Sequence, residues 1–228
     1  MNQVVERLRG ALIVSVQAEA DSVLNTPETI ALFARCAVAN GAAGVRVEGE
    51  ARIAAVRAAL PDIPIVGIVK RAHEGFEPYI TSTAEEVALV ARAGACIVAF
   101  DATARDRSDG STVAGLIAHA RAQGLAAMAD CSDESDAAAA AAAGADMVGT
   151  TLAGYTAPTR GRPLPALDLL SSIARSGAFA VCEGGVATPG DLRAAFAGGA
   201  DAVVVGTAIT NLDVLVRRFA DAAPRRVR

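Results

Sequence analysis

The sequence predicts a fold of the α/β class, in which short buried strands alternate with amphipathic helices. Of its 228 residues, 53% are apolar and 20% are charged, so the chain can bury a large core. Only 4% are aromatic and none is Trp, so this core must consist mainly of Ala, Val, Leu and Ile. No linker or shift in composition interrupts the alternation, which predicts a single domain over residues 1–228.

Eight apolar runs, each short and bounded by turn residues, predict eight strands buried on both faces. They are residues 11–17, 44–47, 64–70, 96–101, 125–130, 147–150, 179–183 and 202–206. A longer run of mixed polarity follows each of them and predicts a helix. These helices are residues 27–40, 50–60, 83–93, 112–123, 133–143, 165–176, 189–197 and 209–220.

Local signals place the ends of these helices. Thr26 and Pro27 provide an N-cap and a first-turn proline for the first helix, and Gly41 ends it. Two glutamates suit the first turn of the helix over 83–93, because the amino end of a helix favours negative charge. The Ala-rich stretch 133–143 is interpreted as a strong helix former that packs closely on the sheet, not as a disordered tract.

Repeated strand–helix units predict a parallel sheet with helices outside it. Eight units in about 220 residues predict closure into a TIM barrel, because closure pairs every strand edge. An open, doubly wound sheet is the alternative architecture.

Composition narrows the class of protein. A net charge of −4 argues against nucleic-acid binding, which needs a clustered basic surface. No segment approaches the roughly 20 apolar residues that span a bilayer, so no membrane partner is expected. The four cysteines are scattered and form no CxxC pair, which favours a reducing compartment. We therefore expect a soluble cytoplasmic protein.

Polar side chains gather at the carboxyl ends of the predicted strands, where barrels of this kind carry their functional residues. These residues are Gln17, Arg46, Lys70, Asp101, Asp130, Thr150, Glu183 and Thr207. A single residue of this kind can be a helix N-cap, and Asp101, Thr150 and Thr207 are each explained equally well in that way. Eight polar residues that converge at one end of a barrel predict a binding pocket there.

Glycines follow the last two predicted strands. Gly184 and Gly185 come after the seventh strand, and Gly206 and Thr207 come after the eighth. Glycines let backbone N–H groups approach an anion, and these two loops hold a phosphate in many barrels. The sequence therefore predicts a phosphate-binding site at these four residues.

Metal and redox cofactors have no support in the sequence. The only histidines are His73, in a loop, and His119, in a predicted helix, so no strand end carries a histidine ligand. No GxGxxG arrangement follows the first strand, as a dinucleotide site would require. We expect no metal and no cofactor.

Proton transfer by Lys70 and Glu183 is the chemistry that remains. A lysine is a good base near neutral pH when burial and neighbouring cations lower its pKa. A carboxylic acid in the same pocket can return the proton from another direction, which is the arrangement of a metal-free epimerase or isomerase. The alternative interpretation is a structural Lys–Glu ion pair in the barrel mouth.

Several segments resemble the bacterial N-acetylmannosamine-6-phosphate 2-epimerase family. They are 13–18 (IVSVQA), 67–71 (GIVKR), 79–81 (YIT), 100–103 (FDAT), 128–130 (MAD), 148–156 (VGTTLAGYT), 182–184 (CEG) and 203–210 (VVVGTAIT). The resemblance covers nearly the whole chain in order, and GTTLAGYT is its most specific part.

The resemblance implies a TIM barrel that interconverts N-acetylmannosamine 6-phosphate and N-acetylglucosamine 6-phosphate in amino-sugar and sialic acid catabolism. It implies no metal, no nucleotide and a homodimer. The catalytic lysine and glutamate of the family fall on Lys70 and Glu183. Its substrate-contacting glutamine, arginine and aspartate fall on Gln17, Arg46 and Asp130.

The GTTLAGYT loop would cover the site, with Thr150, Tyr155 and Arg160 as further substrate-binding residues. The chain departs from the family at Gly185, where many members carry an arginine or lysine. This removes a possible cation on the phosphate side. Glu48 also stands where many members carry a small amide.

Two other functions stay open at the level of the sequence. A barrel that binds a sugar phosphate as a sensor would not need to keep both Lys70 and Glu183. A phosphosugar isomerase of histidine or tryptophan biosynthesis would usually carry a carboxylate at the end of its first strand, where this chain has Gln17.

Overall fold

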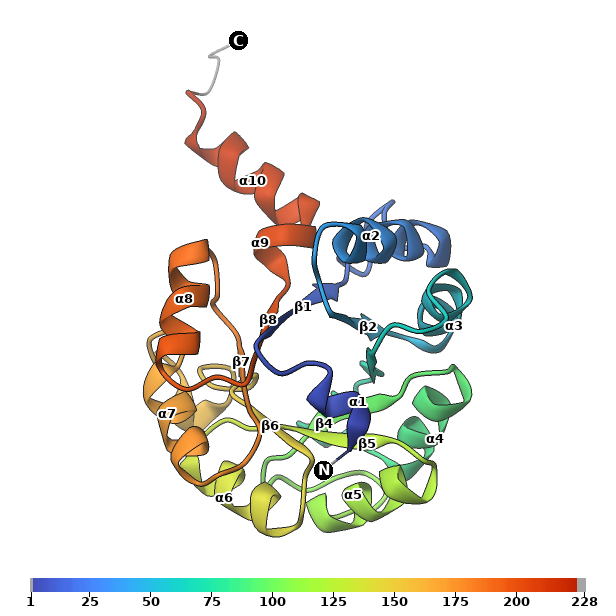
Figure 1. The fold of residues 1–228 in the computed structure, drawn as a ribbon, viewed down its shortest axis with the longest axis vertical. Helices are drawn as coiled ribbons and strands as arrows, with labels where there is room; N and C mark the ends of the chain where they lie inside the picture. Colours follow the sequence, from blue (N-terminus) through green and yellow to red (C-terminus); the bar gives the residue numbers. More distant parts are fainter. Residues whose placement is uncertain (1, 225–228) are drawn as a thin grey trace.

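Eight parallel strands close into a barrel in the computed structural model, which describes residues 2–224 (Figure 1). Each strand pairs with the next along the chain, and the last pairs with the first. The strands are β1 (Ala11–Val16), β2 (Gly44–Glu48), β3 (Ile65–Ile68), β4 (Ile97–Asp101), β5 (Ala126–Asp130), β6 (Met147–Gly149), β7 (Ala180–Glu183) and β8 (Ala202–Val205). The predicted TIM barrel is confirmed, and the open sheet is excluded.

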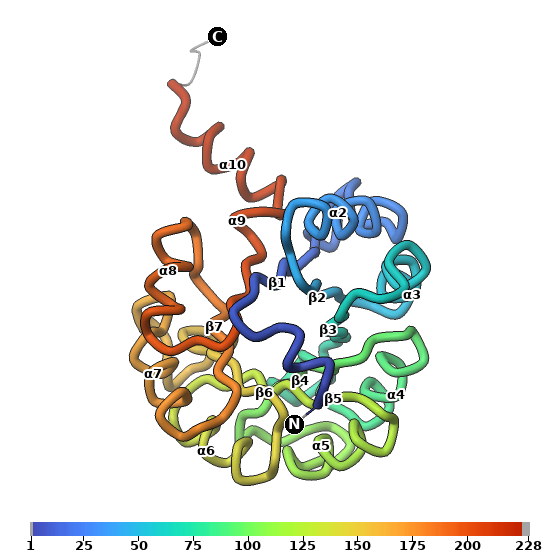
Figure 2. Tube along the Cα trace, in the orientation of Figure 1, coloured from blue at the N-terminus to red at the C-terminus, as the bar shows by residue number. Residues whose placement is uncertain are grey.

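Helices α2 to α8 surround the barrel in a ring, as the tube in Figure 2 shows. The helices along the chain are α1 (Gln3–Glu6), α2 (Pro27–Ala39), α3 (Glu50–Ala59), α4 (Ala84–Arg92), α5 (Val113–Ala122), α6 (Glu134–Ala142), η1 (Ala157–Thr159), α7 (Leu167–Arg175), α8 (Pro189–Ala197), α9 (Thr207–Thr210) and α10 (Leu212–Ala222). Across residues 2–224, no helix combines the length and apolar character that crossing a membrane requires.

The prediction of one helix over 209–220 is wrong. Asn211 has φ −86° and ψ 79°, outside the helical region, and separates α9 from α10. Its side chain accepts a hydrogen bond from the N–H of Val214 and so caps α10. The apolar pattern runs on through both segments, which is why the sequence does not show this break.

Apolar side chains form two layers, one inside the barrel and one between the strands and the outer helices. Ile13, Val66 and Met128 belong to the inner layer and are fully buried. Ala137 and Ala140 of the Ala-rich α6 are buried in the outer layer, as its composition predicts. Burial on both faces explains why the strands are apolar until their last positions.

Helix α1 closes the end of the barrel where the strands begin, opposite their carboxyl ends. Val5 in α1 and Leu8 just after it have no exposed surface and join the inner layer. Figure 1 shows α1 across the opening of the barrel. The sequence does not reveal this helix, because four residues are too few to show a helical period of apolar residues.

Helix α10 projects away from the barrel in Figure 1. No residue of this helix is buried. Leu212, Val216 and Phe219 expose 50%, 56% and 80% of their surface, which leaves an apolar stripe uncovered in this chain.

Replacement of Leu8 by Ala tests whether the segment around α1 stabilises the barrel by closing its amino-terminal end. We expect Leu8→Ala to lower the free energy of unfolding by about 2–5 kcal/mol, because it opens a cavity in the inner layer. Urea denaturation measures this loss. The matched control Val23→Ala, at a residue that is 89% exposed, should change stability by less than about 0.5 kcal/mol. Equal stability of the two variants would contradict the role of Leu8.

Candidate active site

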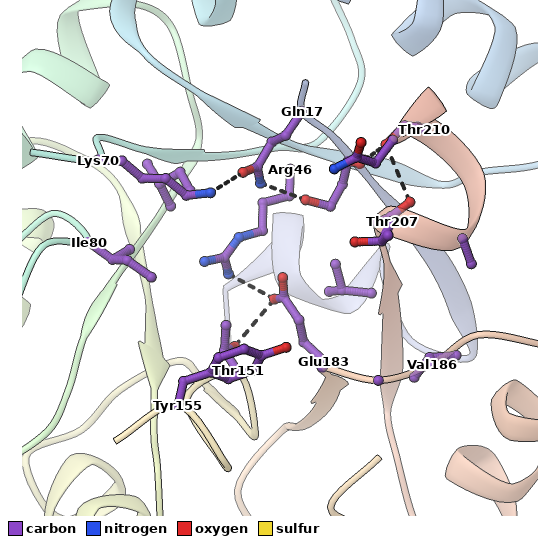
Figure 3. A pocket seen from close by; sticks show the side chains of 18 of the residues that line it. Gln17, Arg46, Lys70, Ile80, Thr151, Tyr155, Glu183, Val186, Thr207 and Thr210 are labelled. Carbon is purple, nitrogen blue, oxygen red and sulfur yellow. Dashed lines mark hydrogen bonds and ion pairs between the residues drawn. The ribbon is translucent and has the colours of Figure 1, made fainter. Parts of the chain in front are cut away.

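A cavity of about 480 Å³ opens at the carboxyl ends of the strands. Its wall includes most of the site residues that the sequence predicts: Gln17, Arg46, Lys70, Tyr155, Glu183, Gly184, Gly185, Gly206 and Thr207. Figure 3 shows Arg46 and Glu183 in the middle of this group. The strand ends thus converge as expected, because parallel strands of one barrel all end at the same rim.

Arg46 is the buried centre of the site. Its Nη2 donates to Oδ2 of Asp130 at 2.7 Å, and its Nη1 donates to Oδ1 at 3.1 Å. The same Nη1 donates to Oε2 of Glu183 at 2.9 Å. Arg46 is 1% exposed and Asp130 is fully buried, so each charge depends on the other for its solvation. The Nε atom of Arg46 is buried and has no partner among the described residues.

Glu183 stands at the end of β7 and titrates close to neutrality. Its pKa is raised to about 7, chiefly by burial and also by the negative charge of Asp130. The cation of Arg46, the hydroxyl of Thr151 and the charge of Lys70 act in the opposite direction. At neutral pH this carboxyl group is therefore able both to hold and to release a proton.

Lys70 follows the end of β3, and it forms a hydrogen bond with Gln17 and not with Glu183. Its Nζ donates to Oε1 of Gln17 at 2.5 Å, and Nε2 of Gln17 donates to Oγ of Ser15 at 2.7 Å. Although the side chain is open to the cavity, the protein around it displaces water and lowers the pKa of Lys70. The positive charge of Arg46 lowers this pKa further.

A structural Lys–Glu ion pair is not formed. Within residues 2–224 the cation paired with Glu183 is Arg46, and Lys70 contacts Gln17 instead. A lysine without a carboxylate partner and with a lowered pKa has the properties of a general base.

Three predicted substrate contacts lie outside the cavity wall. Thr150 is fully buried, and its hydroxyl donates to the carbonyl of Glu183 and accepts from the N–H of the same residue. Asp130 lies behind Arg46, and Arg160 is exposed on the loop after β6. Thr150 and Asp130 therefore hold Glu183 and Arg46 in position from outside the cavity.

Thr151 takes the place that the sequence analysis gave to Thr150. It lines the cavity, and its hydroxyl donates to Oδ1 of Asp130 at 2.7 Å and contacts Oε2 of Glu183 at 3.3 Å. Both threonines follow β6, which ends at Gly149, and only Thr151 lines the cavity. The sequence does not reveal which one does.

Tyr79, Thr210 and Arg218 also line the cavity and were not identified from the sequence. Tyr79 lies in the GIVKR–YIT region of the resemblance, which is the only signal that could have identified it. Arg218 belongs to the projecting α10, whose direction no local pattern reveals.

The glycines of the last two loops offer free backbone donors. Gly184 and Gly185 have φ values of 101° and 74°, which side-chain-bearing residues rarely adopt. Within the described chain, no group accepts from the N–H of Gly184, Gly185 or Gly206. All three residues line the cavity, where such donors suit an anion.

The described residues contain no group of three His, Cys, Asp or Glu side chains able to hold a metal ion. His73 contacts Glu86 through its Nε2 at 3.0 Å, and Glu86 in turn caps α4 together with Thr83. His119 lies in α5, on the outside of the barrel.

Fold and site together define a TIM-barrel enzyme whose strand ends carry a lysine with a lowered pKa and a carboxyl group with a pKa of about 7. A family model described as "Putative N-acetylmannosamine-6-phosphate epimerase" matches residues 30–225. A protein of Synechococcus elongatus described as "Putative N-acetylmannosamine-6-phosphate 2-epimerase" is 45% identical over 227 residues, 98% of each chain. One of the same description from Thermosynechococcus vestitus is 44% identical over 218 residues, 95% of this chain and 94% of the other.

The solved structure of N-acetylmannosamine-6-phosphate 2-epimerase from Clostridium perfringens is 34% identical and superposes with a TM-score of 0.92 over 97% of both chains. The chain belongs to the N-acetylmannosamine-6-phosphate 2-epimerase family. It is an isomerase of the epimerase type, as the resemblance in the sequence implies.

The pKa of Glu183 provides a test of this electrostatic arrangement. We expect Asp130→Asn to lower it from about 7, because the negative charge that raises it is removed. Thr151→Val should raise it, because a hydrogen bond to the carboxylate is lost. Carboxyl ¹³C NMR over a pH series measures both shifts, with Asp62→Asn at an exposed, distant site as control. An unchanged pKa in both variants would refute the arrangement.

Proposed function

We propose that this enzyme interconverts N-acetylmannosamine 6-phosphate and N-acetylglucosamine 6-phosphate by metal-independent proton transfer at C2. The observation that carries the proposal is the lowered pKa of Lys70, in the same cavity as a Glu183 carboxyl group with a pKa of about 7. A lysine with a lowered pKa can serve as the base, and a carboxyl group that is partly protonated at neutral pH can serve as the acid, in an epimerisation beside a carbonyl.

In the proposed mechanism the sugar opens to its aldehyde, and neutral Lys70 removes the proton from C2. The electron pair moves onto the carbonyl oxygen and forms an enolate. Gln17, Arg46 or a bound water donates to this oxygen, and the unpartnered Nε of Arg46 supports a role for that residue. Glu183 in its acid form then protonates C2 on the opposite face.

The phosphate group is proposed to lie at the loops after β7 and β8. The free N–H groups of Gly184, Gly185 and Gly206 support this placement, and the hydroxyl of Thr207 lines the same part of the wall. Such donors recognise an anion without a side chain that would fill the space.

Further substrate contacts are proposed for Tyr155 and Arg160. Tyr155 lines the cavity and is 64% exposed, so its ring is free to move onto a bound sugar. Arg160 follows η1 on the same loop and would have to swing inward to reach the sugar. Asp130 and Thr150 would influence the substrate through Arg46 and Glu183, which they bind.

We place this activity in the cytoplasm, in amino-sugar and sialic acid catabolism, as the family resemblance implies. Free thiols at Cys36, Cys96, Cys131 and Cys182 support a reducing compartment. A homodimer is also proposed, and the exposed apolar stripe of α10 supports it. A monomer mass in sedimentation equilibrium would count against the dimer.

Exchange of the C2 hydrogen with solvent tests the mechanism. In deuterated water the wild-type enzyme should place deuterium at C2 of the product, with or without a chelator. Lys70→Ala should lower kcat by about a thousandfold, and Glu183→Ala should also lose most turnover.

Arg71→Ala serves as the control, because Arg71 adjoins Lys70 in sequence but does not line the cavity. It should keep wild-type turnover. Full turnover by Lys70→Ala and Glu183→Ala would contradict the mechanism. Loss of activity on adding the chelator would contradict the proposal that the reaction needs no metal. Tight binding of the sugar phosphate without any exchange by the wild-type protein would favour a sensor.

A further inference from the structure

Three cations line the cavity wall: Arg46, Lys70 and Arg218. Both terminal nitrogens of Arg46 are engaged by buried carboxylates, so its charge is already compensated inside the protein. Lys70 stands on the opposite side of the cavity from Thr207 and Val186, as Figure 3 shows. Neither cation is available to a phosphate at the loops after β7 and β8.

The loop after β7 has no room for a cation of its own. A Cβ atom on Gly185 would lie 2.3 Å from Cβ of Leu164 and 3.1 Å from its backbone carbon. Because backbone atoms close this space, an arginine or lysine at position 185 would force the neighbouring loop to move. The φ of 74° disfavours such a residue as well.

The same end of the cavity carries a negative charge. Glu19 lines the wall, and its Oε1 accepts a hydrogen bond from Nδ2 of Asn211 at 2.7 Å. A phosphate monoester brings a charge of about −1.5 to −2 at neutral pH. The Glu19 carboxylate would repel this charge, and a cation at the same end of the cavity would offset the repulsion.

Arg218 can supply this positive charge, because it lies at the cavity wall and its guanidinium is not engaged by another group of residues 2–224. Helix α10 begins directly after α9, which follows the glycine loop of β8, and Arg218 lies on it at the cavity wall. Among residues 2–224 no group forms a hydrogen bond or ion pair with its guanidinium. A guanidinium also offers paired N–H donors that fit phosphate oxygens.

We infer that Arg218 of α10 is the phosphate-binding cation of this enzyme and takes the role that Gly185 leaves vacant. This inference rests on the proposed function, because it assumes a phosphorylated substrate in this cavity. Arg218 thereby determines specificity for the phosphate group, and it takes no part in proton transfer at C2.

Kinetics of Arg218→Ala test the assignment. We expect KM for N-acetylmannosamine 6-phosphate to rise about tenfold, with kcat changed less than about twofold, because a charge-assisted contact to the unreactive end is lost. The inhibition constant of inorganic phosphate should rise by a similar factor. Turnover of the same sugar without its phosphate should be equal in wild type and variant.

Arg217→Ala is the matched control, since Arg217 is a neighbouring cation of α10 that does not line the cavity. It should keep the wild-type KM and inhibition constant, and Arg218→Lys should recover part of both. A KM and a phosphate inhibition constant in Arg218→Ala equal to those of Arg217→Ala would overturn the inference. Failure of the proposed function is a separate result, in which wild type itself does not epimerise the phosphorylated sugar.

Discussion

The active site depends on one buried contact, in which the guanidinium of Arg46 binds the carboxylates of Asp130 and Glu183. One cation against two carboxylates leaves an excess of negative charge in a region that excludes water. The protein relieves this excess at Glu183, the less buried carboxyl group, whose pKa rises to about 7. Asp130, which binds Arg46 through both oxygens, keeps that cation in place. The same three residues thus form a buried ion pair and a carboxyl group that titrates near neutral pH.

Arg46 also acts on the opposite wall of the cavity. Its charge disfavours a second cation nearby and therefore helps to lower the pKa of Lys70, which Gln17 holds by a hydrogen bond. Arg46 thus lowers the pKa of Lys70 and opposes the rise in the pKa of Glu183, which burial and Asp130 cause. Under the proposed function, Arg218 and the glycine loops would bind the phosphate, so proton transfer and phosphate binding would use separate charges.

Much of this was predictable from the sequence, for identifiable physical reasons. Lys70 and Glu183 end buried strands, and barrel closure must bring such ends to one rim. Which of Thr150 and Thr151 lines the cavity was not predictable, because it depends on the conformation of the turn that follows β6. Leu8 joins the core only because the barrel has an open end to fill. Arg218 was missed because Asn211 breaks the last helix and changes its direction, an effect that the apolar pattern conceals.

We expect Lys70 to act as a neutral base, because burial and the charge of Arg46 lower its pKa. Direct NMR titration of the Lys70 side chain with ¹⁵N-labelled lysine measures that pKa, with the signal assigned by its loss in Lys70→Arg. We expect a value below the ordinary 10.5 of lysine, and we expect the same group to control the rise of kcat/KM with pH. A Lys70 pKa at or above 10.5 would contradict this expectation.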